Sequence, residues 1–230
     1  MTPLELVRRF TPAERWVHRT TAALMLVCLA TAAMLYLPAL AEIVGRRRLV
    51  VTVHEWTGIA LPAPALLGLA SRAFRGDLGL LNRFNEHDWN WLRGVLRRTP
   101  EELRPAGKFN AGQKLYASFA AGAALVMVGT GLLMWFPHLS TVVWRTGATF
   151  VHDWLALAIG GVVAGHIWMA MRDPEARLGM RTGHVSPEWA RRHHPQWRHD
   201  AHLTDPAPAS DPGTGTHKSS SSLRPPVPPR

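Results

Sequence analysis

The feature that most constrains this sequence is the stretch from Thr149 to Met171, which is long and apolar enough to cross a lipid bilayer. It contains one charged residue, Asp153, and two histidines, His152 and His166. Fourteen residues of α-helix advance about 21 Å and bring a side chain back to within about 40° of the same face. We therefore expect one membrane-spanning helix that presents two imidazoles on one side, near opposite surfaces of the membrane.

Three further stretches meet the length of about 20 apolar residues that a membrane-spanning helix needs. The first and third have uncharged cores, residues 20–41 and 115–137, and the second contains Pro62 and Pro64, which should bend or break its helix. With the helix ends included, the four predicted spans are residues 12–38, 49–71, 111–137 and 147–172. The sequence therefore predicts an all-α fold, a four-transmembrane-helix bundle over residues 1–174.

Arginines and lysines, which give the chain a formal net charge of +10, are unevenly distributed between the loops. Four spans place the N-terminus, the loop between the second and third spans and the C-terminus on one side, and these segments hold most basic residues. The two other loops hold only Arg46, Arg47, Arg48 and Arg145. Because basic residues gather in cytoplasmic loops, we expect a multi-pass protein of the cytoplasmic membrane with both termini in the cytoplasm. Membrane lipid, and not nucleic acid, is the expected partner of this charge.

The remaining segments carry weaker signals. Residues 175–202 are basic and aromatic, which favours a cytoplasmic segment at the membrane interface. Residues 203–230 are rich in Pro and Ser with almost no large apolar residue, so we expect a disordered tail. The single cysteine, Cys28, lies inside the first span, which leaves no disulfide framework. The sequence also has no Cys-x-x-Cys-His motif, which excludes covalently attached c-type haem.

Four histidines fall inside the predicted spans, in two pairs at matching depth. His18 and His166 lie toward the cytoplasmic side, whereas His54 and His152 lie early in helices that enter from the outer side. Polar residues inside a membrane are costly and tend to be functional, and two imidazoles are the axial ligands of a low-spin electron-transfer haem. We therefore predict two b-type haems, with an inner and an outer pair of iron ligands. The alternative is a non-redox membrane anchor or transporter whose histidines bridge helices or relay protons.

Two segments, K-F-N-A-G-Q-K at residues 108–114 and G-H-V-S-P-E-W-A-R-R-H-H-P at residues 183–195, carry a resemblance beyond the histidine pattern. With the paired histidines they resemble the gamma subunit of respiratory formate dehydrogenase, a di-haem cytochrome b in the cytochrome b561-like superfamily. The likeness covers residues 8–200. It implies a subunit that passes electrons from an outer iron–sulfur beta subunit through the outer and then the inner haem to menaquinone or ubiquinone at the cytoplasmic side. Formate oxidation itself would belong to a molybdenum- or tungsten-pterin alpha subunit.

The resemblance also implies a quinone site at the start of the third span, formed by Asn110, Ala111, Gly112 and Gln113. Asn110 and Gln113 have the spacing of a helix cap, so free N–H groups of the helix end would face a quinone carbonyl that gains negative charge on reduction. The alternative is that Asn110 is only a cap. No residue of this chain is expected to be catalytic in its own right.

Two residues depart from the family pattern, and one question stays open. Glu55 and Asp153 each follow a histidine of the outer pair, where apolar residues are expected, and they could pair with Arg46–Arg48 or contact a partner subunit. The electron donor is open as well, because the same cytochrome could serve a hydrogenase or another molybdenum oxidoreductase. Donor identity lies in partner subunits that this sequence does not contain.

Overall fold

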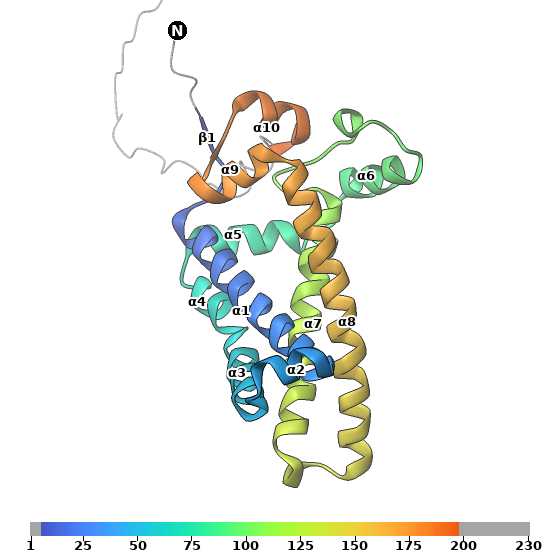
Figure 1. The fold of residues 1–230 in the computed structure, drawn as a ribbon. Helices are drawn as coiled ribbons and strands as arrows, with labels where there is room; N and C mark the ends of the chain where they lie inside the picture. Colours follow the sequence, from blue (N-terminus) through green and yellow to red (C-terminus); the bar gives the residue numbers. More distant parts are fainter. Residues whose placement is uncertain (1–5, 198–230) are drawn as a thin grey trace, which may run out of the picture.

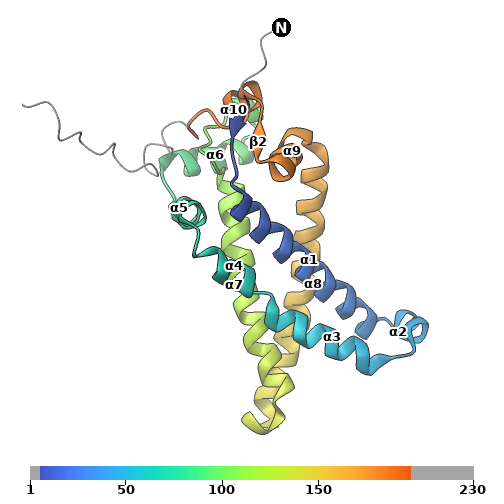
Figure 2. The same cartoon turned by 90° about the vertical axis from the view of Figure 1, so that its left-hand side faces the viewer.

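The computed structural model of the chain describes residues 6–197, and most of this part is helical (Figure 1). The helices of the described part that are long and apolar enough to cross a membrane are α1 (Pro12–Tyr36), α7 (Ala111–Trp135) and α8 (Val142–Arg172). Helices α7 and α8 form an antiparallel hairpin joined by the short 3-10 helix η2 (Pro137–Leu139). Helix α1 runs obliquely across this hairpin (Figure 2). Three of the predicted spans are therefore continuous helices.

The second predicted span is two helices rather than one. Helix α3 (Arg47–Ala60) ends just before Pro62, and α4 (Ala63–Gly68) begins just after it. Proline lacks a backbone N–H and its ring clashes with the preceding turn, so this break follows from the sequence. The 14 residues of α3 advance about 21 Å, which is less than the hydrocarbon thickness of about 30 Å. A crossing here needs α3 and α4 together, and the second predicted span, residues 49–71, stays a prediction.

The connections between the long helices are themselves helical. Helix α1 packs against α3 and α4, and α2 (Pro38–Val44) joins α1 to α3. The segment from α4 to α7 contains α5 (Arg72–Leu81), α6 (Glu86–Leu96) and the 3-10 helix η1 (Glu101–Leu103). Helix α5 lies across the end of the bundle, and both α5 and α6 contact α7 (Figure 1).

Reciprocal caps start two of the long helices, α1 and α7, at this same end. The Thr11 side chain accepts a hydrogen bond from the Glu14 N–H, and the Glu14 carboxylate accepts one from the Thr11 N–H. At the start of α7 the same exchange joins Asn110 and Gln113, at 2.9 and 3.0 Å. Each box satisfies backbone donors that a helix end otherwise leaves free. The cap predicted at Asn110 and Gln113 is confirmed.

The two ends of the described chain fold together at one end of the bundle (Figures 1 and 2). We call this unit the terminal cap; its elements are β1 (Val7–Arg8), α9 (Pro174–Thr182), β2 (His184–Val185) and α10 (Pro187–His193). The strands are antiparallel, with Val7 opposite Val185. Val185 is fully buried, and Trp189 and Ala190 complete its small apolar core. The described part of the predicted interfacial segment thus packs on the N-terminal strand, and the predicted disordered tail lies outside the described residues.

Two buried polar side chains tie the terminal cap to the residues just before α7. The Arg9 guanidinium donates to the Lys108 carbonyl at 3.1 Å and stacks over the Trp189 ring at 4.6 Å. Burial lowers the pKa of Arg9 to about 10, so it stays charged at neutral pH. His194 contacts the Gly107 carbonyl through its Nδ1 at 2.6 Å. Burial, reinforced by the charge of Arg9, lowers the pKa of His194 to about 3, so this ring is neutral.

Gly183→Ala should destabilise the terminal cap. Gly183 has a φ of +91°, and a Cβ there would lie 2.5 Å from the Phe10 carbonyl oxygen. A side chain in this backbone region costs about 1–3 kcal/mol before the clash is counted. We expect a lower thermal unfolding midpoint of the purified protein in detergent. Gly79→Ala is the matched control, because a Cβ there has open space in a helix and should leave the midpoint unchanged or higher.

Candidate functional site

The structure brings the four predicted histidines together as two pairs. His18 of α1 faces His166 of α8, with ring centres 6.2 Å apart and planes at 84°. His54 of α3 faces His152 of α8, with ring centres also 6.2 Å apart and planes at 70°. These are the pairs that depth along the helices predicts, and we call them the inner and the outer pair. Fourteen residues of α8 separate their levels, about 21 Å of helix.

The separation within each pair fits one metal ion between two imidazoles. A metal–imidazole bond is about 2 Å long, and the ring centre lies roughly one ångström behind the nitrogen, so two such ligands place their ring centres about 6 Å apart. Both pairs meet this value at 6.2 Å. If the rings were only in van der Waals contact, there would be no reason for both pairs to have the same distance between ring centres. The residues present at each level therefore fit a metal ion, such as the iron of a haem, that the two imidazoles would hold between them.

Threonines on neighbouring helices hold the outer pair. The Thr31 hydroxyl donates to the Val27 carbonyl of its own helix at 2.7 Å and lies 2.9 Å from Nδ1 of His54. The Thr130 hydroxyl donates to the Val126 carbonyl at 2.7 Å and lies 2.9 Å from Nδ1 of His152. Because each hydroxyl hydrogen points to a carbonyl, each hydroxyl oxygen accepts the Nδ1–H. This tautomer leaves both Nε2 lone pairs free for a metal.

The threonine contacts belong to a sequence repeat that was not recognised from the sequence alone. The segments V-H-E-W at residues 53–56 and V-H-D-W at residues 151–154 occupy corresponding positions, each with a threonine 22 or 23 residues earlier. Each copy is a helical hairpin in which the threonine of the first helix binds the histidine of the second. The spacing was available in the sequence, but only the packing of α1 on α3 and α7 on α8 gives it a meaning.

The inner pair has different surroundings. Among residues 6–197, neither ring of the pair has a hydrogen-bond partner, and Tyr116 of α7 stacks on His166 with ring centres 4.6 Å apart and planes at 16°. Tyr116 is another contact that sequence reasoning missed. The glycines of α8 nearest to His166 in sequence, Gly161 and Gly165, are exposed, and a Cβ at either would meet nothing within 4 Å.

The predicted quinone segment lies at the same end of the bundle as the inner pair. In the reciprocal cap, the side-chain oxygen of Asn110 accepts from the Gln113 N–H and that of Gln113 accepts from the Asn110 N–H. Ala111 is fully buried, and a Cβ at Gly112 would lie 3.1 Å from the Trp91 ring. Ala111 and Gly112 therefore pack against the rest of the protein. Asn110 and Gln113 are the residues of this segment that a ligand can reach. Its assignment to a quinone stays a prediction.

Two lysines that flank this segment are buried in ion pairs. Lys108 contacts both Asp77 of α5 and, at 3.3 Å, Glu14 of α1. Lys114 contacts Asp88 of α6 at 2.7 Å. The sequence placed both lysines in a basic loop and in the K-F-N-A-G-Q-K motif but predicted no partner for either, because their carboxylate partners lie 26 to 94 residues away. The repeated Lys on either side of F-N-A-G-Q was the only local signal.

Asp77 and Glu14 share one lysine, and this sharing affects protonation. Burial and, to a smaller extent, a hydrogen bond with Glu14 raise the pKa of Asp77 to about 8, while the positive charge of Lys108 opposes this rise. Two carboxyl groups in one buried site cannot both ionise easily. Asp77 is therefore the group of this cluster that holds a proton near neutral pH.

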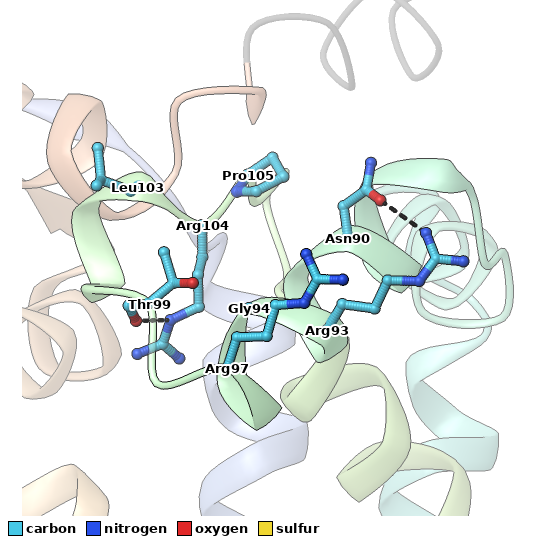
Figure 3. Close-up of a pocket in the computed structure, with 8 residues that line it drawn as sticks. All are labelled: Asn90, Arg93, Gly94, Arg97, Thr99, Leu103, Arg104 and Pro105. Carbon is cyan, nitrogen blue, oxygen red and sulfur yellow. Dashed lines mark hydrogen bonds between the residues drawn. The ribbon is translucent and has the colours of Figure 1, made fainter.

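A hollow elsewhere on the surface is strongly basic. It has a volume of about 380 Å³, lies between α6 and the segment before α7, and is lined in part by Arg93, Arg97 and Arg104 (Figure 3). Two of its arginines are engaged locally: Arg93 donates to Asn90 at 3.2 Å, and Arg104 donates to the Thr99 carbonyl at 3.1 Å. None of its lining residues is a predicted site residue.

Apolar helices of membrane-spanning length that carry facing pairs of imidazoles are the features of a membrane cytochrome b. Sequence comparison makes the assignment narrower. The chain belongs to the prokaryotic cytochrome b561 family, whose model matches residues 9–183. Membership of a cytochrome b family implies haem b as the cofactor.

The chain is also similar to cytochrome subunits of formate dehydrogenases. It is 24% identical over 207 residues to the cytochrome b556(fdo) subunit of Escherichia coli K12, a match that covers 87% of this chain and 95% of the relative. It is 27% identical over 201 residues to the formate dehydrogenase cytochrome b556 subunit of Haemophilus influenzae, covering 84% and 82%. The nitrate-inducible cytochrome b556(Fdn) subunit of E. coli K12 is 25% identical over 135 residues, covering 56% and 62%.

Asp77→Asn should flatten the pH dependence of stability. Because the folded pKa of Asp77 is raised above its ordinary value near 3.8, the stability linked to its protonated form is present in acid and lost as the pH rises toward about 8. We expect the thermal midpoint of the unaltered protein to fall over this range, and that of Asp77→Asn to fall less. Thermal unfolding in detergent at a series of pH values measures this. Glu102→Gln, at an exposed carboxyl, should keep the original slope.

Proposed function

We propose that this chain is the membrane cytochrome b subunit of a formate dehydrogenase complex and holds two b-type haems. The observation that carries the proposal is the presence of two imidazole pairs, each with ring centres 6.2 Å apart, at two levels of α8. The relatives named as formate dehydrogenase cytochrome b556 subunits support the choice of complex. When bound, the haems supply reversible one-electron transfer across the membrane.

The residues of the chain have separate tasks in this proposal. His18 and His166 hold one iron, and His54 and His152 hold the other. Threonine hydroxyls keep the outer rings in the tautomer that binds metal. Because α1, α7 and α8 are long and apolar enough to cross a membrane, both levels would lie in apolar surroundings, which favour burial of the apolar porphyrin ring.

The direction of transfer follows from the proposed orientation. The end with the terminal cap carries the basic segments of the chain, so we place it in the cytoplasm. The outer pair then lies nearer an iron–sulfur beta subunit on the outer face, and the inner pair lies nearer a menaquinone or ubiquinone beside Asn110 and Gln113. An alpha subunit with a molybdenum or tungsten pterin would supply the electrons. The chain would act as the quinone-reducing subunit and leave formate oxidation to that partner.

Replacement of the histidines should remove the haems pair by pair. We expect His18→Ala and His166→Ala each to lose the same haem, and His54→Ala and His152→Ala each to lose the other, because each variant removes one of the two protein ligands of that iron. Reduced-minus-oxidised spectra and the haem-to-protein ratio of the purified complex measure the loss. His138→Ala, in η2, is the control and should keep both haems. Loss of the same haem from His18→Ala and His54→Ala would reject the pairing; no b-type α-band in the unaltered protein would favour a non-redox anchor.

Asn110→Ala should slow quinone reduction while both haems keep their spectra. Its side chain would be the nearest polar group of the cap to the quinone, so its loss should lower the rate by about 10-fold, the effect of one lost hydrogen bond. The measurement is reoxidation of the reduced haems after mixing with a soluble quinone. Asn85→Ala removes the equivalent cap of α6 and controls for helix stability. An unchanged rate in Asn110→Ala would leave Asn110 as a helix cap alone.

A further inference from the structure

The two histidine pairs differ in what their second ring nitrogen contacts. Both outer rings donate Nδ1–H to a threonine oxygen at 2.9 Å. The inner rings have no such acceptor among residues 6–197. Since the two outer contacts come from different helices and match in distance, they are a repeated feature of the two hairpins.

A hydrogen bond from Nδ1–H changes the opposite nitrogen of the ring. The acceptor oxygen draws the proton away from the ring, so Nε2 becomes more basic and donates more charge to a bound metal. Stronger donation stabilises ferric iron more than ferrous iron, because ferric iron carries the higher charge. An imidazole pair held in this way therefore lowers the reduction potential of its iron relative to a pair without acceptors.

Charges along the bundle act in the same direction. Glu55 and Asp153 follow the two outer histidines directly. In the inner pair, Arg19 follows His18 directly and donates to the Met180 and Arg181 carbonyls at 3.1 and 2.9 Å. Carboxylates near an iron stabilise its oxidised form, and guanidinium groups stabilise its reduced form.

We infer that Thr31 and Thr130 are positioning residues that give the outer haem the lower reduction potential of the two. The inference rests on the proposed function, because it requires a haem on each histidine pair. Electrons that enter at the outer pair would then move to the inner pair with a favourable driving force. All four ligands are histidines, so the ligand type cannot distinguish the two haems. The direction of transfer would instead come from the hydrogen bonds that the outer histidines make to Thr31 and Thr130.

Thr31→Val and Thr130→Val test this inference. Valine keeps the shape of threonine and removes the oxygen, so we expect the midpoint potential of one haem to shift upward while that of the other is unchanged. Redox titration of the α-band in the purified complex measures both potentials. The low-spin ferric EPR signal of the same haem should shift as well, which a general loss of stability would not cause. The shifted component should be the one that His54→Ala removes.

Two further variants make the result decisive. Thr31→Ser retains the hydroxyl and should restore the original potential. Thr146→Val is the matched control, because Thr146 of α8 donates to its own helix at the Val142 carbonyl, 2.9 Å away, and contacts neither pair. Unchanged potentials in both threonine variants, or a shift of the haem that His18→Ala removes, would overturn the inference. Failure of the unaltered complex to contain two haems would instead reject the proposed function.

Discussion

The ammonium group of Lys108 lies where three parts of the chain meet, between the carboxyl groups of Glu14 on α1 and Asp77 on α5 and just before α7 begins. Its backbone carbonyl also accepts from Arg9, which joins the terminal cap to the same point. Removing one partner of a buried ion pair leaves an uncompensated charge, which costs about 3–5 kcal/mol. This cluster therefore sets how the bundle end is assembled, and with it the position of Asn110 and of the inner histidine pair.

Within the apolar part of the bundle, side-chain polarity rather than hydrophobic burial selects neighbours. Lipid tails are as apolar as leucine, so helices gain little from hiding apolar surface against each other. The contacts that distinguish one arrangement from another are polar: Thr31 with His54, and Thr130 with His152. In the proposed function these contacts serve twice, because they join α1 to α3 and α7 to α8 and also orient the imidazoles toward a metal.

Much of this arrangement could be predicted from periodicity and caps. Apolar stretches with at most one charged residue predicted α1, α7 and α8, Pro62 predicted the break after α3, and the depth of the histidines along their helices matched the pairs in the structure. The terminal cap was not predicted. Strands of two residues give no periodic signal, and Val7 and Val185 pair across most of the sequence.

The sequence by itself determined which segments can cross a membrane and which histidines share a depth, because helix rise and hydrophobic length are local properties. Tertiary structure alone decided which helix lies against which, and hence that Thr31 and Thr130 bind the outer histidines while Tyr116 stacks on an inner one. The tertiary structure also buries the side chain of Lys108, which the sequence places in a basic loop. Such contacts join residues 22 to 94 positions apart, and no local pattern encodes their geometry.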